Sequence, residues 1–183
     1  LPIYLSKDAT NTNFLNTNLK LSKALHYVVG YNWRINKNTR FKAEAYYQNL
    51  FDIPVDVSGQ NGYTAINAQS SDIFEITGTP LTNDGKGRNY GIEFTLERFL
   101  NKGFYYLSTL SLYDSKYKVG NGKYLNTIFN GNYVFNLLSG KEFAVGTKGN
   151  KTFGINAKFV LEGGKRVTGI DEAASIAGQT TVF

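Results

Sequence analysis

The sequence predicts an all-β protein, and three observations favour an antiparallel transmembrane β-barrel. Apolar and polar residues alternate along long segments such as "LHYVVGYNWRINKNTRFKAEAYYQNLF" (25–51), which is the period of a strand with two different faces. These segments span about 11 to 14 residues, against about five or six in globular strands, and a tilted membrane strand needs that length. The polar faces carry charges such as Lys42 and Glu44, and aromatic residues gather near strand ends, as at membrane interfaces.

Composition narrows the class of protein without deciding it. The chain has 183 residues, enough for one domain, and a formal charge of +6 from scattered basic residues, so nothing indicates a nucleic-acid groove. The absence of Cys excludes disulfides and thiolate metal sites. No apolar run reaches the roughly 18 residues of a membrane helix, which leaves membrane strands open. Aromatics make up 15% of the chain. An aromatic-rich soluble β-sandwich would look similar.

The beginning of the chain predicts a piece of a longer or processed protein. The sequence contains no Met, even at its first position. The opening stretch "LPIYLSKDATNTNF" lacks the basic region and apolar run of a signal peptide. Residues 1–22 are rich in Asn, Thr and Ser and are expected to form a loop.

The first two strands are expected at 23–36 and 40–53, on either side of the short turn "NKNT". In both segments the odd positions are mostly apolar and the even positions mostly polar, with Val28 as an exception. Pro54 then weakens any further ladder. Residues 56–87 are expected to form a long, Gly-rich loop, and connections of that length are more often functional or mobile.

Four more strands are expected, at 88–98, 104–117, 126–138 and 151–162. The segment 104–117 has apolar residues at both parities, which indicates either burial on both faces or a β-bulge. A turn is expected over 139–150 and a loop over 163–183. The connections tend to alternate between short and long, as the turns and loops of membrane barrels do.

In a barrel of this kind the polar faces look into a hydrated lumen and the apolar faces contact lipid. The expected lumen-facing residues are His26, Arg34, Lys42, Glu44, Gln48, Glu93, Glu97, Asn132, Asn156 and Lys158. The expected lipid-facing or girdle residues are Trp33, Phe51, Tyr90, Phe94, Phe153 and Phe159. The rival β-sandwich instead predicts that Ile92, Phe94, Phe153 and Ile155 pack against a second sheet.

Four stretches resemble the β-barrel of TonB-dependent receptors from Bacteroidetes, of the type with a carboxypeptidase-regulatory-like amino-terminal domain. They are "LSKALHYVVGYNWRINKNTRFKAEAYYQNLFDIPV" (21–55), "GRNYGIEFTLERFLNKGFYYLSTLSLYDSKYK" (87–118), "YLNTIFNGNYVFNLLSGKEF" (124–143) and "KTFGINAKFVLEGGKRVTGIDEAASI" (151–176). These are scaffold motifs, specific for the family and poor on substrate.

The resemblance implies a barrel of about 22 strands around a plug domain, of which residues 1–183 supply about six strands and no plug. It implies a location in the bacterial outer membrane and uptake of a glycan, a siderophore-like chelate or a peptide, energised by TonB through the plug. Further partners would be membrane lipid and a surface lipoprotein, with no cofactor and no nucleic acid. External loops of the family help to capture ligand, so the candidate contacts are Gln60, Asn61, Tyr63 and Asn67.

Covalent chemistry is not expected. His26 is the single histidine, and a metal site or nucleophilic triad would need partners for it. Glu93 and Glu97 are separated by roughly 13 Å on a strand, too far for most carboxylate pairs of glycosidases. The stretch "GKGRNYG" (85–91) lacks the Lys-Ser/Thr of a phosphate loop.

Overall fold

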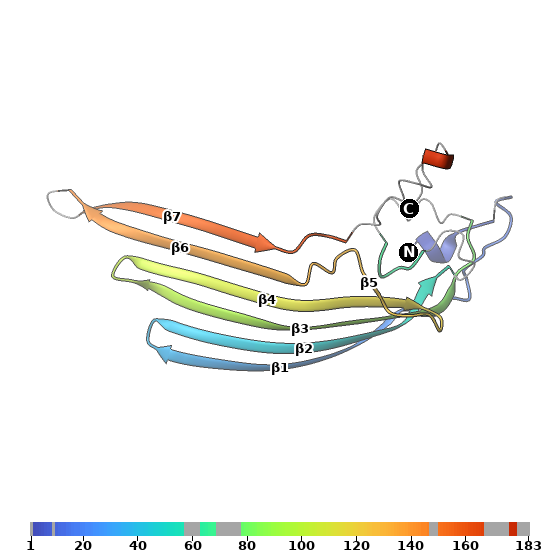
Figure 1. Cartoon of the computed structure of the whole chain (residues 1–183), viewed down its shortest axis with the longest axis horizontal. Coiled ribbons are helices and arrows are strands. Elements are labelled where there is room, and N and C mark those ends of the chain that lie inside the picture. Colours follow the sequence, from blue (N-terminus) through green and yellow to red (C-terminus); the bar gives the residue numbers. More distant parts are fainter. Residues whose placement is uncertain are drawn as a thin grey trace.

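The structure, a computed structural model, describes residues 2–8, 10–56, 63–68, 78–146, 150–166 and 176–178. Its strands form one antiparallel sheet in the order β1-β2-β3-β4-β6-β7, with β5 paired to β4. Figure 1 shows the six long strands running side by side in a single curved layer. The predicted all-β antiparallel class is therefore confirmed.

Most strands are long and follow one another along the chain, so the sheet is a meander. A short 3₁₀ turn, η1, covers Pro2–Leu5. The strands are β1 (Lys23–Asn36), β2 (Thr39–Val55), β3 (Thr82–Asn101), β4 (Phe104–Val119), β5 (Leu125–Asn126), β6 (Tyr133–Val145) and β7 (Lys151–Glu162). Among the described residues, no helix has the length and hydropathy that a membrane crossing requires.

The two ends of the sheet differ. Tight connections join β1 to β2, β3 to β4, and β6 to β7 at one end. The longer connections, from β2 to β3 and from β4 to β6, lie at the other end together with η1 (Figure 1). We call these the turn end and the loop end. This asymmetry is the one that short periplasmic turns and longer external loops give to membrane barrels.

The strand expected at 126–138 is shifted towards the carboxyl end, and only residues 133–138 of it belong to β6. Residues 127–132 leave the ladder, and β6 runs from Tyr133 to Val145. The amide of Ser115 on β4 is bonded by the side chain of Asn130 at 3.1 Å, where a strand neighbour would supply a backbone carbonyl. The connection expected at 139–150 consequently shortens, because the strand continues to Val145 and leaves only 146–150.

The loop expected at 56–87 is also shorter, because β3 begins at Thr82. Gly85 allows this close pairing with β2: a Cβ there would lie 2.5 Å from Val55 Cγ1 and 2.7 Å from the Ile53 carbonyl oxygen. Turn-forming composition predicted a loop, and pairing with two neighbouring strands overrides it. The bulge considered for β4 is not found, since its register with β3 is unbroken from Val119 to Tyr106.

Buried residues gather at the loop end rather than along the sheet. Ile53 and Val55 are buried at the end of β2, and Tyr63 packs with Leu81 in a small apolar cluster. The expected loop 1–22 contains η1 and a bridge between Lys7 and Phe14. The strands themselves have large apolar side chains that no other part of the described chain covers.

Candidate site on the polar face

The strand register sorts the predicted residues onto two faces, because directly opposed residues point to the same side of a sheet. We call one side the apolar face. Across the strands it carries, among others, Leu25, Tyr27, Val29, Tyr31, Trp33, Phe41, Ala43, Ala45, Tyr47, Phe51, Tyr90, Ile92, Phe94, Leu96, Leu110, Leu112, Phe135, Leu137, Phe153, Ile155, Phe159 and Leu161. All six predicted lipid-facing residues lie on this face. Its contact with lipid stays a prediction.

The opposite side is the polar face. It holds all the predicted lumen-facing residues that lie in strands, namely His26, Arg34, Lys42, Glu44, Gln48, Glu93, Glu97, Asn156 and Lys158. Asn132 is different: it lies before β6 in a left-handed conformation, with φ of 69°, and its amide donates to Tyr113 O and Asn130 Oδ1. Asn132 thus holds the segment before β6 against the backbone of β4.

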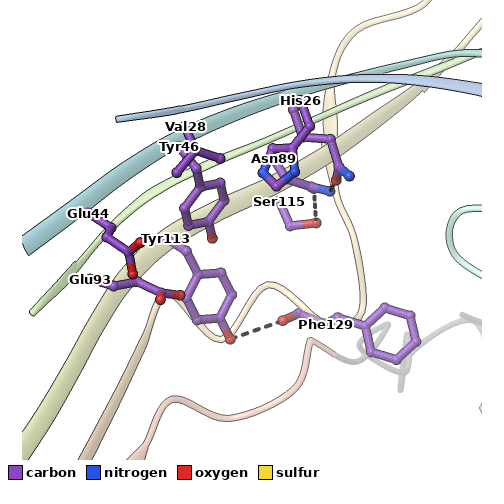
Figure 2. Close-up of a pocket in the computed structure, with 10 residues that line it drawn as sticks. His26, Val28, Glu44, Tyr46, Asn89, Glu93, Tyr113, Ser115 and Phe129 are labelled. Carbon is purple, nitrogen blue, oxygen red and sulfur yellow. Dashed lines mark hydrogen bonds between the residues drawn. The ribbon is translucent and has the colours of Figure 1, made fainter. Parts of the chain in front are cut away.

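A pocket of about 460 Å³ opens on the polar face towards the loop end. Side chains of four neighbouring strands point into it, and Phe129 lies across from them on the chain that connects β5 to β6 (Figure 2). The lining residues are His26, Val28, Glu44, Tyr46, Gln48, Asn89, Glu93, Tyr113, Ser115 and Phe129. The site therefore combines carboxylates, amides and three aromatic rings.

The two carboxylates of the pocket have different surroundings. Glu44 and Glu93 lie directly opposite each other on β2 and β3. Lys42 Nζ lies 2.5 Å from Glu44 Oε2, whereas Glu93 Oε1 accepts only a long 3.4 Å bond from Ser111 Oγ. Among the described residues, Glu93 has no basic partner. The pocket thus keeps a negative charge beside its aromatic walls.

A row of polar side chains crosses the upper part of the pocket. Asn89 Nδ2 donates to Gln48 Oε1 at 2.7 Å, and Ser115 Oγ donates to Asn89 Oδ1 at 2.7 Å. Thr127 Oγ1 donates to Ser115 Oγ at 2.9 Å. These bonds fix the orientation of amide and hydroxyl groups that can bind a hydroxylated ligand, and linked bonds of this kind strengthen one another.

Residues 127–132, here the inward segment, are tied to the edge of β4 by Asn130. This side chain is 0% exposed and donates to Asp114 Oδ1 at 2.7 Å and to Asn126 Oδ1 at 2.9 Å. Tyr113 Oη also donates to the Phe129 carbonyl, as Figure 2 shows. These bonds hold Phe129 at the pocket.

Some pocket residues were not predicted. The alternation of the sequence is enough to assign Tyr46 and Asn89 to the polar face. Tyr113 and Ser115 fall in the segment 104–117, whose apolar and polar faces the sequence did not distinguish. Phe129 was expected in a strand, so no sequence signal placed it over the pocket.

Of the predicted loop contacts, the structure describes Tyr63 and Asn67, and neither lines this pocket. Gln60 and Asn61 lie outside the described residues. Tyr63 is 6% exposed and packs in the loop-end cluster. Asn67 Oδ1 accepts a 2.7 Å bond from the backbone of Ile128. Tyr63 thus packs against other loop-end residues, and Asn67 holds the backbone of Ile128. Ligand contact by either residue stays a prediction.

No group of three or more potential metal ligands occurs within the described part of the chain. What the geometry defines is a wall: one layer of long antiparallel strands with an exposed apolar side, a polar side that carries a pocket, and turns and loops at opposite ends. Residues 3–182 match the family model described as TonB dependent receptor-like, beta-barrel. No curated protein and no solved structure matches the chain.

The chain belongs to this family of TonB-dependent receptor β-barrels, since the match covers nearly its whole length. The family consists of receptors and transporters rather than enzymes. Membership implies a place in the outer membrane and a part in TonB-dependent uptake of a ligand.

Proposed function

We propose that this chain forms part of the barrel wall of an outer-membrane nutrient receptor, with its apolar face against lipid and its polar face against a hydrated lumen. One observation carries the proposal. Large side chains of the apolar face are uncovered, with Val29 71%, Tyr31 64% and Phe153 55% exposed. A face of this size and composition is stable only against another apolar medium.

The dimensions of the apolar face support a membrane position. On β1 the face runs from Leu25 to Trp33 without a charged residue, and eight strand steps span about 26 Å. At a tilt of about 40° this length covers roughly 20 Å of the membrane normal, within the apolar band of about 25 Å in outer-membrane barrels. Tyr47 stacks on Tyr90 at one limit of the band, with ring centroids 6.5 Å apart.

The alternative, a soluble β-sandwich, requires a second sheet over the same face. The described residues form a single sheet, and Ile92 and Ile155 are 45% and 55% exposed. Nothing in the described chain therefore supplies the packing that the sandwich predicts for these residues.

The sheet needs further strands to close. β1 and β7 each have one neighbour within the described chain, and open edges are not tolerated in lipid, while closed membrane barrels have at least about eight strands. We propose a barrel of about 22 strands with a plug and TonB as its energy source. The Bacteroidetes type and a surface lipoprotein partner belong to the same proposal.

Among the nutrients considered, namely a glycan, a siderophore-like chelate or a peptide, the pocket favours a glycan. The amide and hydroxyl row through Gln48, Asn89 and Ser115 offers donors and acceptors to sugar hydroxyls. The rings of Tyr46, Tyr113 and Phe129 offer flat apolar surface to the opposite side of a ligand.

Substitutions at two adjacent valines of β1 test which face of the sheet contacts lipid. Val28 lies opposite Tyr46 on the polar face, and Val29 lies opposite Ala45 on the apolar face. In the complete receptor, Val29→Arg is expected to destabilise the inserted barrel by about 2–4 kcal/mol. The matched change Val28→Arg is expected to be tolerated, because its charge reaches water.

Extraction of outer membranes with and without detergent, together with heat-modifiable electrophoretic mobility, measures the folded inserted fraction. Loss of the inserted fraction in the Val29 variant alone supports the proposal. Equal tolerance of both arginines, or recovery of the unmodified receptor in buffer without detergent, contradicts it.

A further inference from the structure

Four basic side chains lie together on the apolar side of the sheet at the loop end. Lys86 and Arg88 belong to β3, and Lys116 and Lys118 belong to β4. The register places Lys86 opposite Lys118 and Arg88 opposite Lys116. We call this group, two successive pairs of like charge, the cationic patch.

Like charges directly opposite each other destabilise an antiparallel pair of strands, so an anion bound between them would stabilise the arrangement. Within the described chain only Lys116 has an ion-pair partner, Asp114, at 3.0 Å. That carboxylate oxygen is already shared with the hydroxyl of Tyr90, which donates to it at 2.6 Å. The patch therefore has more positive charge than its neighbours neutralise.

An aromatic ring holds part of the patch in place. The guanidinium carbon of Arg88 lies 4.1 Å from the ring centroid of Tyr124, and Lys118 Nζ lies 5.4 Å from the same centroid. Cation–π contacts attract both groups to the ring but leave their net charge intact. The two cations are thus brought to one place without an anion between them.

The basic residues at the turn end of the same face are arranged differently. Arg98 lies opposite Tyr106, and Lys141 lies opposite Phe104 and Ile155. Lys141 Nζ also donates to the carbonyl of Lys102 at 3.0 Å. A buried Nε without a hydrogen-bond partner is common to Arg88, Arg98 and Arg40. On the apolar face, the facing like charges therefore distinguish the loop end, and that atom does not.

The position of the patch relative to the apolar band matches the depth of lipid headgroups. Along β3 the face passes from Ile92 to Tyr90 and then to Arg88 and Lys86. By the strand rise, Arg88 lies about 7 Å and Lys86 about 13 Å beyond Tyr90. Tyrosine rings mark the membrane–water interface, and basic groups just outside it meet headgroup phosphates.

We propose that the cationic patch is a binding site for the phosphate group of a membrane lipid in the leaflet at the loop end. The phosphate would lie between the facing cations, where Arg88 can donate a pair of parallel hydrogen bonds and the lysines add charge. The acyl chains would continue along Ile92 and Leu112, which lie on the same face. This inference rests on the membrane orientation proposed above.

The test uses the complete receptor, purified in an uncharged detergent, and measures bound lipid by native mass spectrometry. Three probes separate the sources of binding: dioleoyl phosphatidic acid, dioleoylglycerol with the same chains and no phosphate, and inorganic phosphate. The patch variant is Lys86→Gln, Arg88→Gln and Lys118→Gln, which leaves the Lys116 pair in place. The control variant is Arg98→Gln, Lys141→Gln and Lys151→Gln, which removes the same charge from the turn end of the same face.

The patch variant is expected to bind phosphatidic acid at least about tenfold more weakly than the unmodified receptor. The control variant should stay within about twofold, dioleoylglycerol should bind weakly, and inorganic phosphate should not displace the lipid. Equal binding by the patch variant and the unmodified receptor overturns the inference, as does an equal loss in the control variant. Displacement by inorganic phosphate at similar concentration would indicate a soluble anion instead.

Failure of this inference can be told apart from failure of the proposed function. A receptor that inserts, passes the test on the two valines and still binds lipid without the patch contradicts the lipid site alone. A receptor that does not insert contradicts the membrane orientation, and the lipid site with it.

Discussion

Glu44 on β2 and Glu93 on β3 lie directly opposite each other on the polar face of the sheet. Four residues further along β3, Glu97 lies opposite Arg40, whose Nη2 is 2.6 Å from Glu97 Oε2. Two glutamates on one face of one strand therefore have opposite electrostatic surroundings.

This difference predicts opposite effects of the same substitution. Glu93→Gln removes a facing like charge and is expected to raise the free energy of unfolding, by up to about 1 kcal/mol. Glu97→Gln removes an ion pair between partly exposed groups and is expected to lower it by about 0.5–1 kcal/mol. Urea unfolding of the receptor in lipid vesicles measures both, and Trp33 offers a fluorescent probe within this chain. Changes of the same sign would contradict the assigned pairing.

Asn130 is expected to control the inward segment. Its buried side chain makes two donor bonds, to Asp114 and Asn126, and its oxygen accepts from the Ser115 amide. Asn130→Ala removes these three bonds of a buried side chain, at a cost of about 1–3 kcal/mol. Hydrogen exchange should accelerate over 127–132. Asn136→Ala is the control, since Asn136 donates a single bond of 3.2 Å to Thr109. If the control variant accelerated hydrogen exchange over 127–132 as much as Asn130→Ala does, the prediction would be contradicted.

Gly91 is expected to be irreplaceable on the polar face, where it lies between Tyr46 of β2 and Tyr113 of β4. A Cβ at this position would lie 2.6 Å from the Leu112 carbonyl oxygen and 2.9 Å from the Tyr46 hydroxyl. Gly91→Ala therefore forces β3 and β4 to shift apart, and a loss of about 1–3 kcal/mol of unfolding free energy is expected. Gly154→Ala should be nearly neutral, because the nearest atom, Glu142 Cγ, is 4.0 Å away. A neutral Gly91 variant in the same unfolding assay would show that the contact between β3 and β4 is looser than described.

Asp8 is expected to keep its turn formed in acid. Its carboxylate accepts bonds from the Thr12 backbone N–H at 3.0 Å, from Asn13 Nδ2 at 2.8 Å and from the Thr10 hydroxyl at 2.9 Å. The Thr12 bond, followed by the Asn13 side-chain bond, lowers the pKa of Asp8 well below its usual range.

Because the folded pKa is lowered, the stabilisation is fully present above the unfolded pKa of about 3.9 and is lost as pH falls towards the folded value. A titration of the Asp8 carboxyl carbon by NMR should therefore show ionisation persisting below pH of about 3.9. Asp8→Asn, which cannot ionise, should remove the pH dependence of the Thr12 amide signal. A midpoint at the ordinary aspartate value would contradict the network of bonds.

The amino-acid sequence by itself determined the all-β class and the division of the strands into an apolar and a polar face. Side chains alternate strictly along a strand, so a face such as Tyr90-Ile92-Phe94 is a local property and does not depend on the neighbours. The same period explains why Val28 and Val29 could be assigned to different sides before any pairing was known.

Only the tertiary structure decided which strand positions meet. Register joins residues that are distant in sequence, and it made Glu97 a partner of Arg40 and Glu93 a neighbour of Glu44. It also extended β3 through the glycines before Arg88, where composition predicted a loop. The side chain of Asn130 takes over a backbone bond of β4 and turns 127–132 away from the ladder. These outcomes depend on hydrogen bonds between separate strands, and no short stretch of sequence contains both partners.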